Sequence, residues 1–269
     1  MSHDRQQTYA GWSHSQTPCY RPAMTEAFPH AVILAAGVGR RLNGSAGPRP
    51  KALLPFGGRT LLDRHLAALR ACGVRDVTVV AGFEAGQVRD AVGADPHVQV
   101  VLNPDYREGS VVSLWAARDV VRAGRPLVLM DADVLYDARL LGRLLSSAHP
   151  NALLLDRDLE PGDEPVKLCI RDGQIVDFHK RPQAPHDWHG ESVGFFRFAP
   201  SVAADLAARA GDYMQGRRAL EYEEPIRDMM QAAPPGLFGF EDITGLPWTE
   251  IDFPEDVAKA SLLLPRLVA

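Results

Sequence analysis

The sequence is poor in the residues that cross-link small secreted domains. Its 269 residues include three cysteines, Cys19, Cys72 and Cys169, which lie far apart and form neither a CxxC motif nor a Cys/His pattern. This spacing argues against a disulfide framework and a zinc site, and it favours a reducing compartment. A chain of this length buries roughly three quarters of the surface of its unfolded state, so one large domain needs no such cross-links.

Long apolar runs and an excess of positive charge are also absent. No stretch approaches the length of about 18 apolar residues that a membrane span needs, and residues 1–29 lack the apolar run of a secretory signal. We therefore expect a cytoplasmic protein in which residues 1–29 form a disordered or loosely docked extension and residues 30–269 form one domain. The net charge of −5 gives no reason to expect nucleic acid or an anionic membrane as a partner. Nothing in the composition excludes a homodimer.

Apolar segments alternate regularly in the first half of the chain. The run His30–Ala36 predicts a buried strand, the apolar spacing over Leu61–Cys72 predicts a helix, and Asp76–Ala81 predicts a second strand. Further helices are expected at residues 85–92 and 110–121, and further strands at residues 98–102 and 126–130. This alternation predicts an α/β fold with a single Rossmann-like, mixed but mainly parallel sheet and helices on both faces.

The second half of the chain has a different pattern. Four strand-like segments follow one another with only turns between them, at residues 152–155, 166–171, 174–179 and 192–198. The pair Asp172-Gly173 is typical of a hairpin turn. Helices are expected at residues 201–210, 222–232 and 254–264. This half is therefore expected to be α+β and to extend the same sheet.

The segment after the first strand has the composition of an anion-binding loop. From Arg40 to Lys51 there are four cations, no acid, and several glycines and prolines. Glycines let backbone N–H groups approach a phosphate, and Arg and Lys side chains donate charged hydrogen bonds to its oxygens. The alternative is a basic surface loop without a ligand. A Walker A loop is excluded because Gly-Lys-Ser/Thr is absent, and a dinucleotide fingerprint is disfavoured because Leu42 stands where it needs a small residue.

Two motifs in this loop resemble the signature of the nucleotidyltransferases that make NDP-sugars and CDP-alcohols. They are Leu-Ala-Ala-Gly-x-Gly-x-Arg-Leu at residues 34–42 and Pro-Lys-Ala-Leu-Leu-Pro at residues 50–55. The resemblance extends over about residues 30–260 and implies the nucleotide-diphospho-sugar transferase fold. It implies that Arg41 and Lys51 bind the triphosphate and stabilise the transition state. It also implies that the loop backbone holds the nucleotide, at Leu34, Ala35, Ala36, Gly37 and Gly39.

Two further segments resemble the phosphocholine cytidylyltransferase branch of this family. Residues 79–83, which include Gly82, are similar to the segment near the base. Residues 103–117, which include Gly109 and Ser110, are similar to the segment that reads the base, although this branch usually has Asn at those two positions. The resemblance therefore favours CTP over other nucleoside triphosphates.

Two acidic segments can supply the ligands of a metal ion. Asp131 and Asp133 stand at the end of an expected parallel strand, the edge where open α/β sheets bind ligands, and Glu250-Ile-Asp252 is the second segment. Carboxylates suit Mg²⁺, which takes most of its other ligands from water and phosphate. The resemblance assigns Asp133 and Asp252 to the metal and gives Asp131 a supporting position. The second segment also has the sequence of a helix start, with Asp256 as the cap.

Candidate acceptor residues lie in the second half. Lys180 resembles the lysine that holds the acceptor phosphate in sugar nucleotidyltransferases, with a solvated loop cation as the alternative, and Glu191 lies in a segment similar to the acceptor-lining strand. Tyr222 and Trp248 are the aromatic candidates for an amine-binding site. A larger cage could combine them with Trp115, Trp188 and the acidic run Glu221, Glu223 and Glu224. Trp115 is better explained as a core residue, and the acidic run equally well as a solvated helical turn.

The combined interpretation is a Mg²⁺-dependent cytidylyltransferase. An acceptor oxygen attacks the α-phosphorus of CTP in line and pyrophosphate leaves, so no general base is needed, while Mg²⁺, Lys51 and Arg41 neutralise the charge. The expected acceptor is a small phosphoalcohol or phosphonate, similar to phosphocholine or 2-aminoethylphosphonate. The alternatives are a sugar- or cyclitol-1-phosphate nucleotidyltransferase and a catalytically silent, nucleotide-binding regulatory subunit. His65, in an amphipathic helix, is interpreted as structural.

Overall fold

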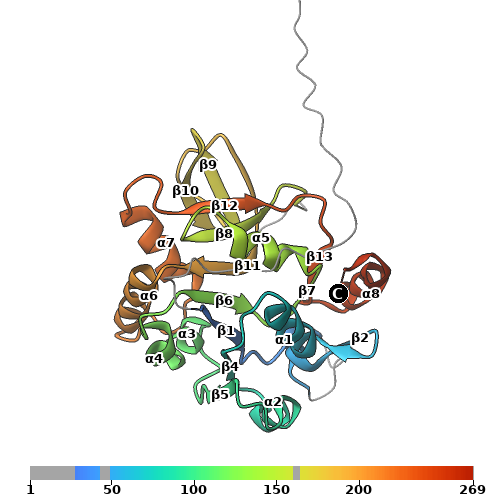
Figure 1. Ribbon diagram of the computed structural model, residues 1–269. Helices are drawn as coiled ribbons and strands as arrows, with labels where there is room; N and C mark the ends of the chain where they lie inside the picture. Colours follow the sequence, from blue (N-terminus) through green and yellow to red (C-terminus); the bar gives the residue numbers. More distant parts are fainter. Residues whose placement is uncertain (1–27, 43–48, 160–163, 269) are drawn as a thin grey trace, which may run out of the picture.

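A nine-stranded sheet forms the centre of the protein, as the computed structural model shows (Figure 1). The structure describes residues 28–42, 49–159 and 164–268, so the expected extension over residues 1–29 lies almost entirely outside the described residues. The strands of this sheet are β1 (His30–Ala35), β4 (Val77–Ala81), β5 (Val98–Leu102), β6 (Leu127–Asp131), β8 (Ala152–Asp156), β9 (Lys167–Arg171), β10 (Gln174–His179), β11 (Trp188–Phe198) and β12 (Gly239–Asp242).

The strand order is β10-β9-β11-β6-β1-β4-β5, with β8 paired to β11 and β12. Strands β6, β1, β4 and β5 run parallel to one another, so their carboxyl ends meet at one edge, where Leu34 is in register with Asp131 and with Val80. Strand β11 runs antiparallel to β6, β8 and β9. The hairpin from β9 to β10 turns at Asp172 and Gly173, both of which have positive φ. These pairings confirm the predicted mixed sheet and its hairpin.

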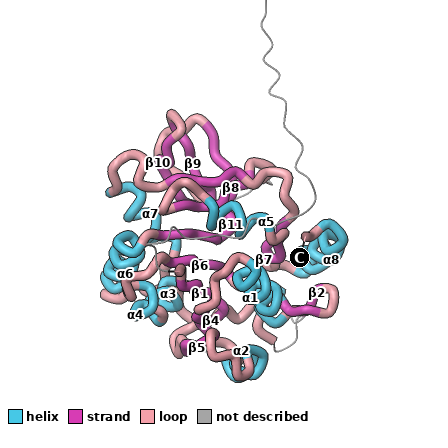
Figure 2. The backbone as a smooth tube through the Cα atoms, viewed as in Figure 1, coloured by secondary structure: helices cyan, strands magenta, loops and turns pink. Residues whose placement is uncertain are grey.

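Helices cover both faces of the sheet (Figures 1 and 2). Because side chains alternate along a strand, Ile33 of β1 packs into the core on one face and Val32 into the core on the other. The first core includes side chains of α1 (Leu61–Ala71), α2 (Ala85–Val92) and α5 (Arg139–Ser146). The second core includes side chains of α3 (Val111–Ala116), α4 (Arg118–Val121), α6 (Pro200–Tyr213) and α7 (Glu223–Ala232).

A smaller apolar cluster joins the C-terminal part of the chain to the region around the anion loop. It includes Leu42, Phe56 and Ile251. The elements of this region are η1 (Arg40–Leu42), η2 (Lys51–Leu53), β2 (Pro55–Phe56), β3 (Arg59–Thr60), β7 (Val134–Tyr136), β13 (Trp248–Glu250), α8 (Pro254–Leu263) and η3 (Leu264–Arg266). Strand β13 pairs with β7, which follows β6 directly. This pairing brings residues 250–252 beside the end of β6.

The structure differs from the predicted elements in three places. The helix expected over residues 110–121 is split into α3 and α4 at Ala117, whose φ of −88° and ψ of 5° leave helical geometry. Strand β11 begins at Trp188, earlier than expected, because its first residues pair with β9. Helix α5, strand β12 of the central sheet and the short strands β2, β3, β7 and β13 were not predicted.

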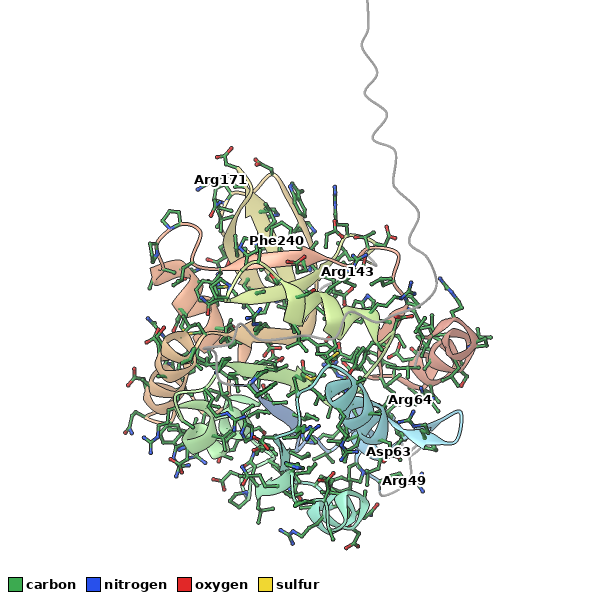
Figure 3. All side chains as sticks on the ribbon, viewed as in Figure 1. Arg49, Asp63, Arg64, Arg143, Arg171 and Phe240 are labelled. Carbon is green, nitrogen blue, oxygen red and sulfur yellow. The ribbon has the colours of Figure 1, made fainter. Side chains whose placement is uncertain are left out.

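Figure 3 shows Arg171 and Phe240 over the half that contains β8 to β10, whereas Asp63 and Arg64 lie around α1 in the half that contains the anion loop. Across residues 28–42, 49–159 and 164–268, no helix has both the length and the apolar character needed to cross a membrane.

Candidate functional site

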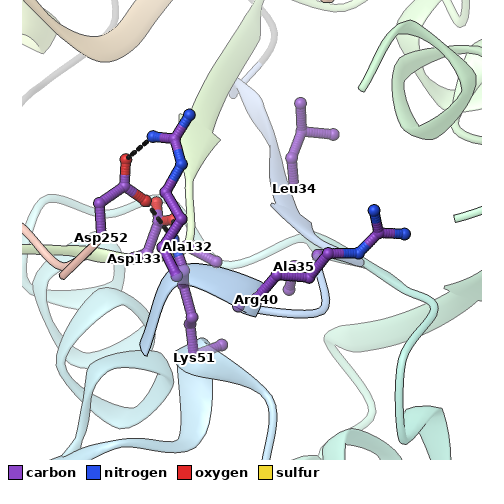
Figure 4. A pocket seen from close by; sticks show the side chains of 11 residues that line it. Leu34, Ala35, Arg40, Lys51, Ala132, Asp133 and Asp252 are labelled. Atoms are coloured by element: carbon purple, nitrogen blue, oxygen red, sulfur yellow. Dashed lines mark hydrogen bonds and ion pairs between the residues drawn. The ribbon is translucent and has the colours of Figure 1, made fainter. Parts of the chain in front are cut away.

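The anion-loop residues converge at the carboxyl ends of β1 and β6. A cavity of about 210 Å³ opens there (Figure 4). Its walls are Leu34, Ala35, Gly37, Gly39, Arg40, Arg41, Lys51, Ala52, Ala132, Asp133 and Asp252. Ala36 is buried behind this wall and its carbonyl accepts the N–H of Phe83 at 3.1 Å. The structure thus brings both motifs of the loop and both predicted metal ligands to one place.

Gly39 lets the loop fold closely around Lys51. Its φ is +63°, a conformation that side-chain-bearing residues rarely adopt. A Cβ at this position would lie 3.1 Å from Cγ of Lys51, so the neighbouring side chain would have to shift. The glycine in this motif is therefore required by the backbone conformation and by the close approach of the lysine.

Lys51 lies between the two carboxylates predicted to hold the metal. Its Nζ donates to Oδ2 of Asp133 at 2.9 Å and also to Oδ1 of Asp252. Burial disfavours the charged form, but attraction by Asp133 and Asp252 outweighs it and raises the pKa of Lys51 above its usual value. The cavity wall therefore carries a fixed positive charge at neutral pH.

Arg41 supplies a second, more exposed cation. Its Nη1 donates to Oε2 of Glu164 at 3.0 Å and to Oδ2 of Asp252 at 3.3 Å. The guanidinium also lies over the ring of Phe253, 5.3 Å from its centroid. Arg41 is therefore held near Asp252 by contacts at the surface of the cavity. Figure 4 shows that the neighbouring Arg40 points away from the carboxylates.

Asp133, Glu250 and Asp252 form a cluster that fits a divalent cation. One carboxylate oxygen of each lies within 4.8 Å of the others. The N–H of Ile251 donates to the carbonyl of Asp133 at 2.9 Å, which ties the two acidic segments together. Oxygen ligands on two tied segments match the preference of Mg²⁺, and the ammonium of Lys51 is already stabilised by the same carboxylates. Burial and repulsion by Asp133 raise the pKa of Glu250.

Glu250 was not among the metal ligands predicted from the sequence. The available signal was its spacing from Asp252, because residues two apart in an extended segment share a face. Asp256 has the predicted capping position: its Oδ2 accepts the N–H groups of Asp252 at 2.9 Å and Phe253 at 2.8 Å. This cap leaves the side chain of Asp252 free of that task and directed toward Lys51.

Asp131 is enclosed at the end of β6. Its Oδ2 accepts the hydroxyl of Tyr222 at 2.6 Å, and a Cβ at Gly194, where φ is +76°, would collide with the same oxygen. Burial and repulsion by Asp133 raise the pKa of Asp131 well above its usual value. Asp131 is therefore the hydrogen-bond partner that fixes the position of the Tyr222 hydroxyl.

A larger cavity of about 630 Å³ adjoins the first one. All four predicted acceptor residues line it: Lys180, Glu191, Tyr222 and Trp248. Asp252 lines both cavities, so a ligand in each would meet at this carboxylate. The two cavities are therefore adjacent, with the acidic cluster at their junction.

Three of these acceptor candidates have contacts that orient them: Trp248, Tyr222 and Lys180. Nε1 of Trp248 donates to Oδ2 of Asp156 at 2.7 Å. Tyr222 packs edge-on against Phe196, with ring centroids 6.0 Å apart, and its ring is buried. Nζ of Lys180 lies 3.1 Å from Oε1 of Glu221. Burial disfavours the charged lysine, but Glu221 outweighs it and raises the pKa of Lys180.

The prediction of a larger aromatic cage, in which Trp115 and Trp188 join Tyr222 and Trp248, is wrong. Trp188 packs edge-on against Phe240 at 5.8 Å, with the Arg157 guanidinium 4.7 Å from the ring centroid. Trp115 is partly buried against the second core, as predicted, with a guanidinium on its face. Both rings are occupied by packing, so among the described residues Tyr222 and Trp248 remain from that set as cavity walls.

The three residues predicted near the base lie outside the smaller cavity. A Cβ at Gly82 would collide with Tyr106, and a Cβ at Gly109 would collide with the backbone of Leu220. Oγ of Ser110 accepts the N–H of Tyr222 at 2.9 Å. Gly82 is therefore packed against Tyr106, whereas Gly109 and Ser110 contact residues 220–222. The role of these three residues toward a base remains a prediction.

Comparison with known proteins identifies the family of this domain. The sequence profile described as "MobA-like NTP transferase domain" matches residues 31–221. The CMP-5'-(3-aminopropyl)phosphonate synthase of Streptomyces rubellomurinus is 28% identical over 88% of this chain, which spans 39% of that protein. The bifunctional IPC transferase and DIPP synthase of Rubrobacter xylanophilus is 30% identical over 84% of this chain, which spans 50% of it. The chain thus spans half or less of these curated relatives.

A solved structure shares the fold. The CTP:phosphocholine cytidylyltransferase of Streptococcus pneumoniae superposes with a TM-score of 0.72, over 88% of this chain and 100% of the other. The two sequences are 18% identical, so this likeness concerns the fold alone.

Proposed function

We infer a specific activity from the fact that this chain belongs to the MobA-like NTP transferase domain family. The proposed enzyme is a Mg²⁺-dependent cytidylyltransferase that transfers CMP from CTP to a small phosphonate or phosphoalcohol. An oxygen of the acceptor forms a bond to the α-phosphorus of CTP, the bond from this phosphorus to the bridging oxygen breaks, and pyrophosphate leaves with the bonding electrons. No proton has to be removed, because the attacking oxygen is already an anion.

One observation carries this proposal: the two cavities meet at Asp252. The smaller cavity is lined by the glycine loop with Lys51, and the larger one by Lys180 and Glu191. A reaction between two phosphate-bearing molecules needs adjacent sites that hold them in line and offset their repulsion. The arrangement of the described residues supports such a reaction.

Lys51 and Arg41 are proposed to act on the triphosphate. In the structure both cations are paired with Asp252. When the carboxylates bind a metal, the ammonium and the guanidinium become available to phosphate oxygens nearby. They then stabilise the negative charge that accumulates on the phosphates in the transition state.

Asp133 and Asp252 are proposed to hold Mg²⁺, with Glu250 as an additional ligand from the same cluster. The bound ion supplies charge neutralisation and orientation of the phosphate oxygens. Lys180, Glu191, Tyr222 and Trp248 are proposed to bind the acceptor, and Gly82, Gly109 and Ser110 to lie near the base. The preference for CTP and for a phosphonate acceptor is supported by the name of the Streptomyces relative.

The test is pyrophosphate release by the full chain with Mg²⁺. CTP, UTP, GTP, dTTP and ATP are each combined with several acceptors. The acceptors are 2-aminoethylphosphonate, phosphocholine, inositol phosphate and glucose-1-phosphate. We expect turnover with CTP and an amine-bearing acceptor. Turnover confined to inositol phosphate or glucose-1-phosphate would refute the acceptor class and favour the sugar or cyclitol alternative.

Two variants connect this activity to the site. Asp133→Asn and Lys51→Ala should reduce turnover by at least about 100-fold while the fold remains intact. Asp119→Asn is the matched control, because Asp119 is 67% exposed on α4 and pairs with Arg122 at the surface. Near-normal pyrophosphate release by Asp133→Asn or Lys51→Ala would contradict the proposed roles.

A further inference from the structure

Glu223 has a carboxylate oxygen that the protein itself does not satisfy. It is the first residue of α7 and lines the larger cavity. Its Oε2 is shielded from solvent and has no hydrogen-bond partner among the described residues. A buried acceptor without a partner costs about 1–3 kcal/mol, and more when it is charged. An oxygen in this state at a cavity wall points to a partner supplied by the ligand.

The neighbouring acidic residues differ from Glu223 in this respect. Glu221 pairs with Lys180 at 3.1 Å, and Glu224 pairs with His179 at 3.2 Å. Asp131, at the end of β6, accepts the hydroxyl of Tyr222. The acidic run is therefore not a uniformly solvated helical turn. Two of its three carboxylates form ion pairs within the protein, whereas Glu223 has an oxygen, Oε2, without a partner among the described residues at the wall of the cavity.

The charge of the larger cavity also calls for a cation. Its walls carry nine carboxylates and three cationic side chains. The carboxylates are Asp131, Asp156, Asp158, Glu164, Glu191, Glu223, Glu250, Asp252 and Asp256, and the cations are Lys180, Lys259 and Arg266. A phosphonate or phosphate ester adds further negative charge to this cavity. An acceptor that also carries a positive group reduces this repulsion.

The charged groups around Glu223 favour its neutral form while the cavity lacks such a cation. Burial and repulsion by Glu221 raise the pKa of Glu223 to about 8, and the charge of Lys180, which follows β10, opposes this shift. Repulsion by Glu224 on the same helix raises the pKa of Glu223 further, and Asp131 on β6, whose own pKa is raised by its neighbours, lies near it. An incoming cation reverses this preference, because it stabilises the carboxylate.

We propose that Glu223 binds the positively charged nitrogen of the acceptor and thereby selects phosphonates and phosphate esters that carry an ammonium group. The proposal rests on the proposed function insofar as it takes the larger cavity as the acceptor site. Binding is coupled to proton release: the carboxyl proton of Glu223 leaves to solvent, and the carboxylate then pairs with the ammonium. Glu223 is thus a specificity-determining residue that touches the substrate away from its reacting oxygen.

Calorimetric binding of two acceptors that differ only at the nitrogen tests this proposal. The wild-type chain, Glu223→Gln and Glu224→Gln are each titrated with 2-aminoethylphosphonate and with ethylphosphonate. The titrations are repeated with an α,β-methylene analogue of CTP, which cannot release pyrophosphate. Wild type should bind the amine compound at least about tenfold more tightly, a difference of about 1.4 kcal/mol. Glu223→Gln should lose this preference, and Glu224→Gln should keep it.

Two further readouts separate a binding role from a structural one. At pH 7.5 the binding enthalpy of wild type should depend on the ionisation enthalpy of the buffer, as expected for proton release, and this dependence should disappear in Glu223→Gln. Glu223→Asp, which keeps the charge, should retain part of the preference for the amine. If Glu223→Gln does not fold, Glu223→Asp and the wild-type comparison keep the proposal falsifiable, because equal wild-type affinity for the two compounds would still overturn it.

The outcomes distinguish this proposal from the proposed function. Equal affinity of wild type for both compounds, or an amine preference that survives in Glu223→Gln, would overturn the role of Glu223 even if CTP is turned over. Amine-selective binding that depends on Glu223, without pyrophosphate release from any triphosphate, would overturn the transferase reaction and support the binding role. Binding of neither compound by wild type would overturn the role of Glu223, and pyrophosphate release with phosphocholine would then decide whether the transferase reaction stands.

Discussion

Replacing Lys51 by Met removes the positive charge between Asp133 and Asp252 while it keeps most of the side-chain length. Lys51 is 14% exposed, and the two carboxylates are 23% and 26% exposed. Breaking a fully buried ion pair costs about 3–5 kcal/mol. Because these groups are partly screened by solvent, we expect a loss of about 2 kcal/mol. In a domain of this size, such a loss lowers the Tm by about 4–8 °C.

The same variant should bind divalent cations more tightly than the wild-type protein, and its Tm should rise more when they are added. In wild type an incoming ion competes with the ammonium for two carboxylates, whereas in Lys51→Met the cluster with Glu250 is left uncompensated. We expect Mn²⁺ to bind the variant at least about tenfold more tightly and to restore much of the lost Tm. The assay combines thermal melts over a metal titration with Mn²⁺ binding measured by electron paramagnetic resonance.

Arg40→Met is the matched control for this experiment. Arg40 lines the same cavity, but its side chain points away from the carboxylates (Figure 4). Its loss should leave the Tm and the metal affinity close to those of wild type. Equal Mn²⁺ affinity in Lys51→Met and wild type, or an unchanged Tm without metal, would refute the conclusion that Lys51 neutralises the acidic cluster.

Two further predictions concern the core. Burial lowers the pKa of His65 to about 4, below the unfolded value of about 6.5. Its contribution to the free energy of unfolding is therefore fully present above pH 6.5 and falls by about 3 kcal/mol as the pH falls toward 4. Urea unfolding at several pH values should show a smaller loss of stability at acid pH for His65→Gln than for wild type, and an equal loss would exclude His65 as its cause. Gly194→Ala should lower the Tm more than Gly173→Ala, since both glycines have positive φ but only a Cβ at Gly194 would collide with Asp131. Equal Tm losses would show that the collision is relieved at no cost.

The elements of the fold that the sequence predicts best are those with a local period. The buried runs of β1 and β6 and the helical spacing in α1 and α6 needed no knowledge of their partners. Strands β7 and β13 have three residues each, too few to show a period, and they form because they pair with each other across a long stretch of chain. Helix α5 carries apolar pairs at helical spacing that face the first core, so its sequence does contain a helical pattern.

The candidate site was predictable where a contiguous motif carries it. The glycine loop with Arg41 and Lys51 is one such motif, and Asp133 stands at a recognisable strand end. The missing partner of Glu223 Oε2 was not predictable, because it depends on which residues pair with the adjacent carboxylates of Glu221 and Glu224. The larger aromatic cage failed for a similar reason: the partner of Trp188, Phe240, lies far along the chain.

The position of Asp252 in the chain has a consequence for how the enzyme is made. Lys51 and Asp252 are separated by 201 positions in the sequence, and the carboxylate is carried on a segment that pairs with β7. Contacts this distant form late, because a long loop must close before they contribute. During synthesis, the anion loop and the parallel strands can therefore fold before residues 248–252 have left the ribosome. The nascent domain therefore lacks a complete acidic cluster until that segment has been synthesised.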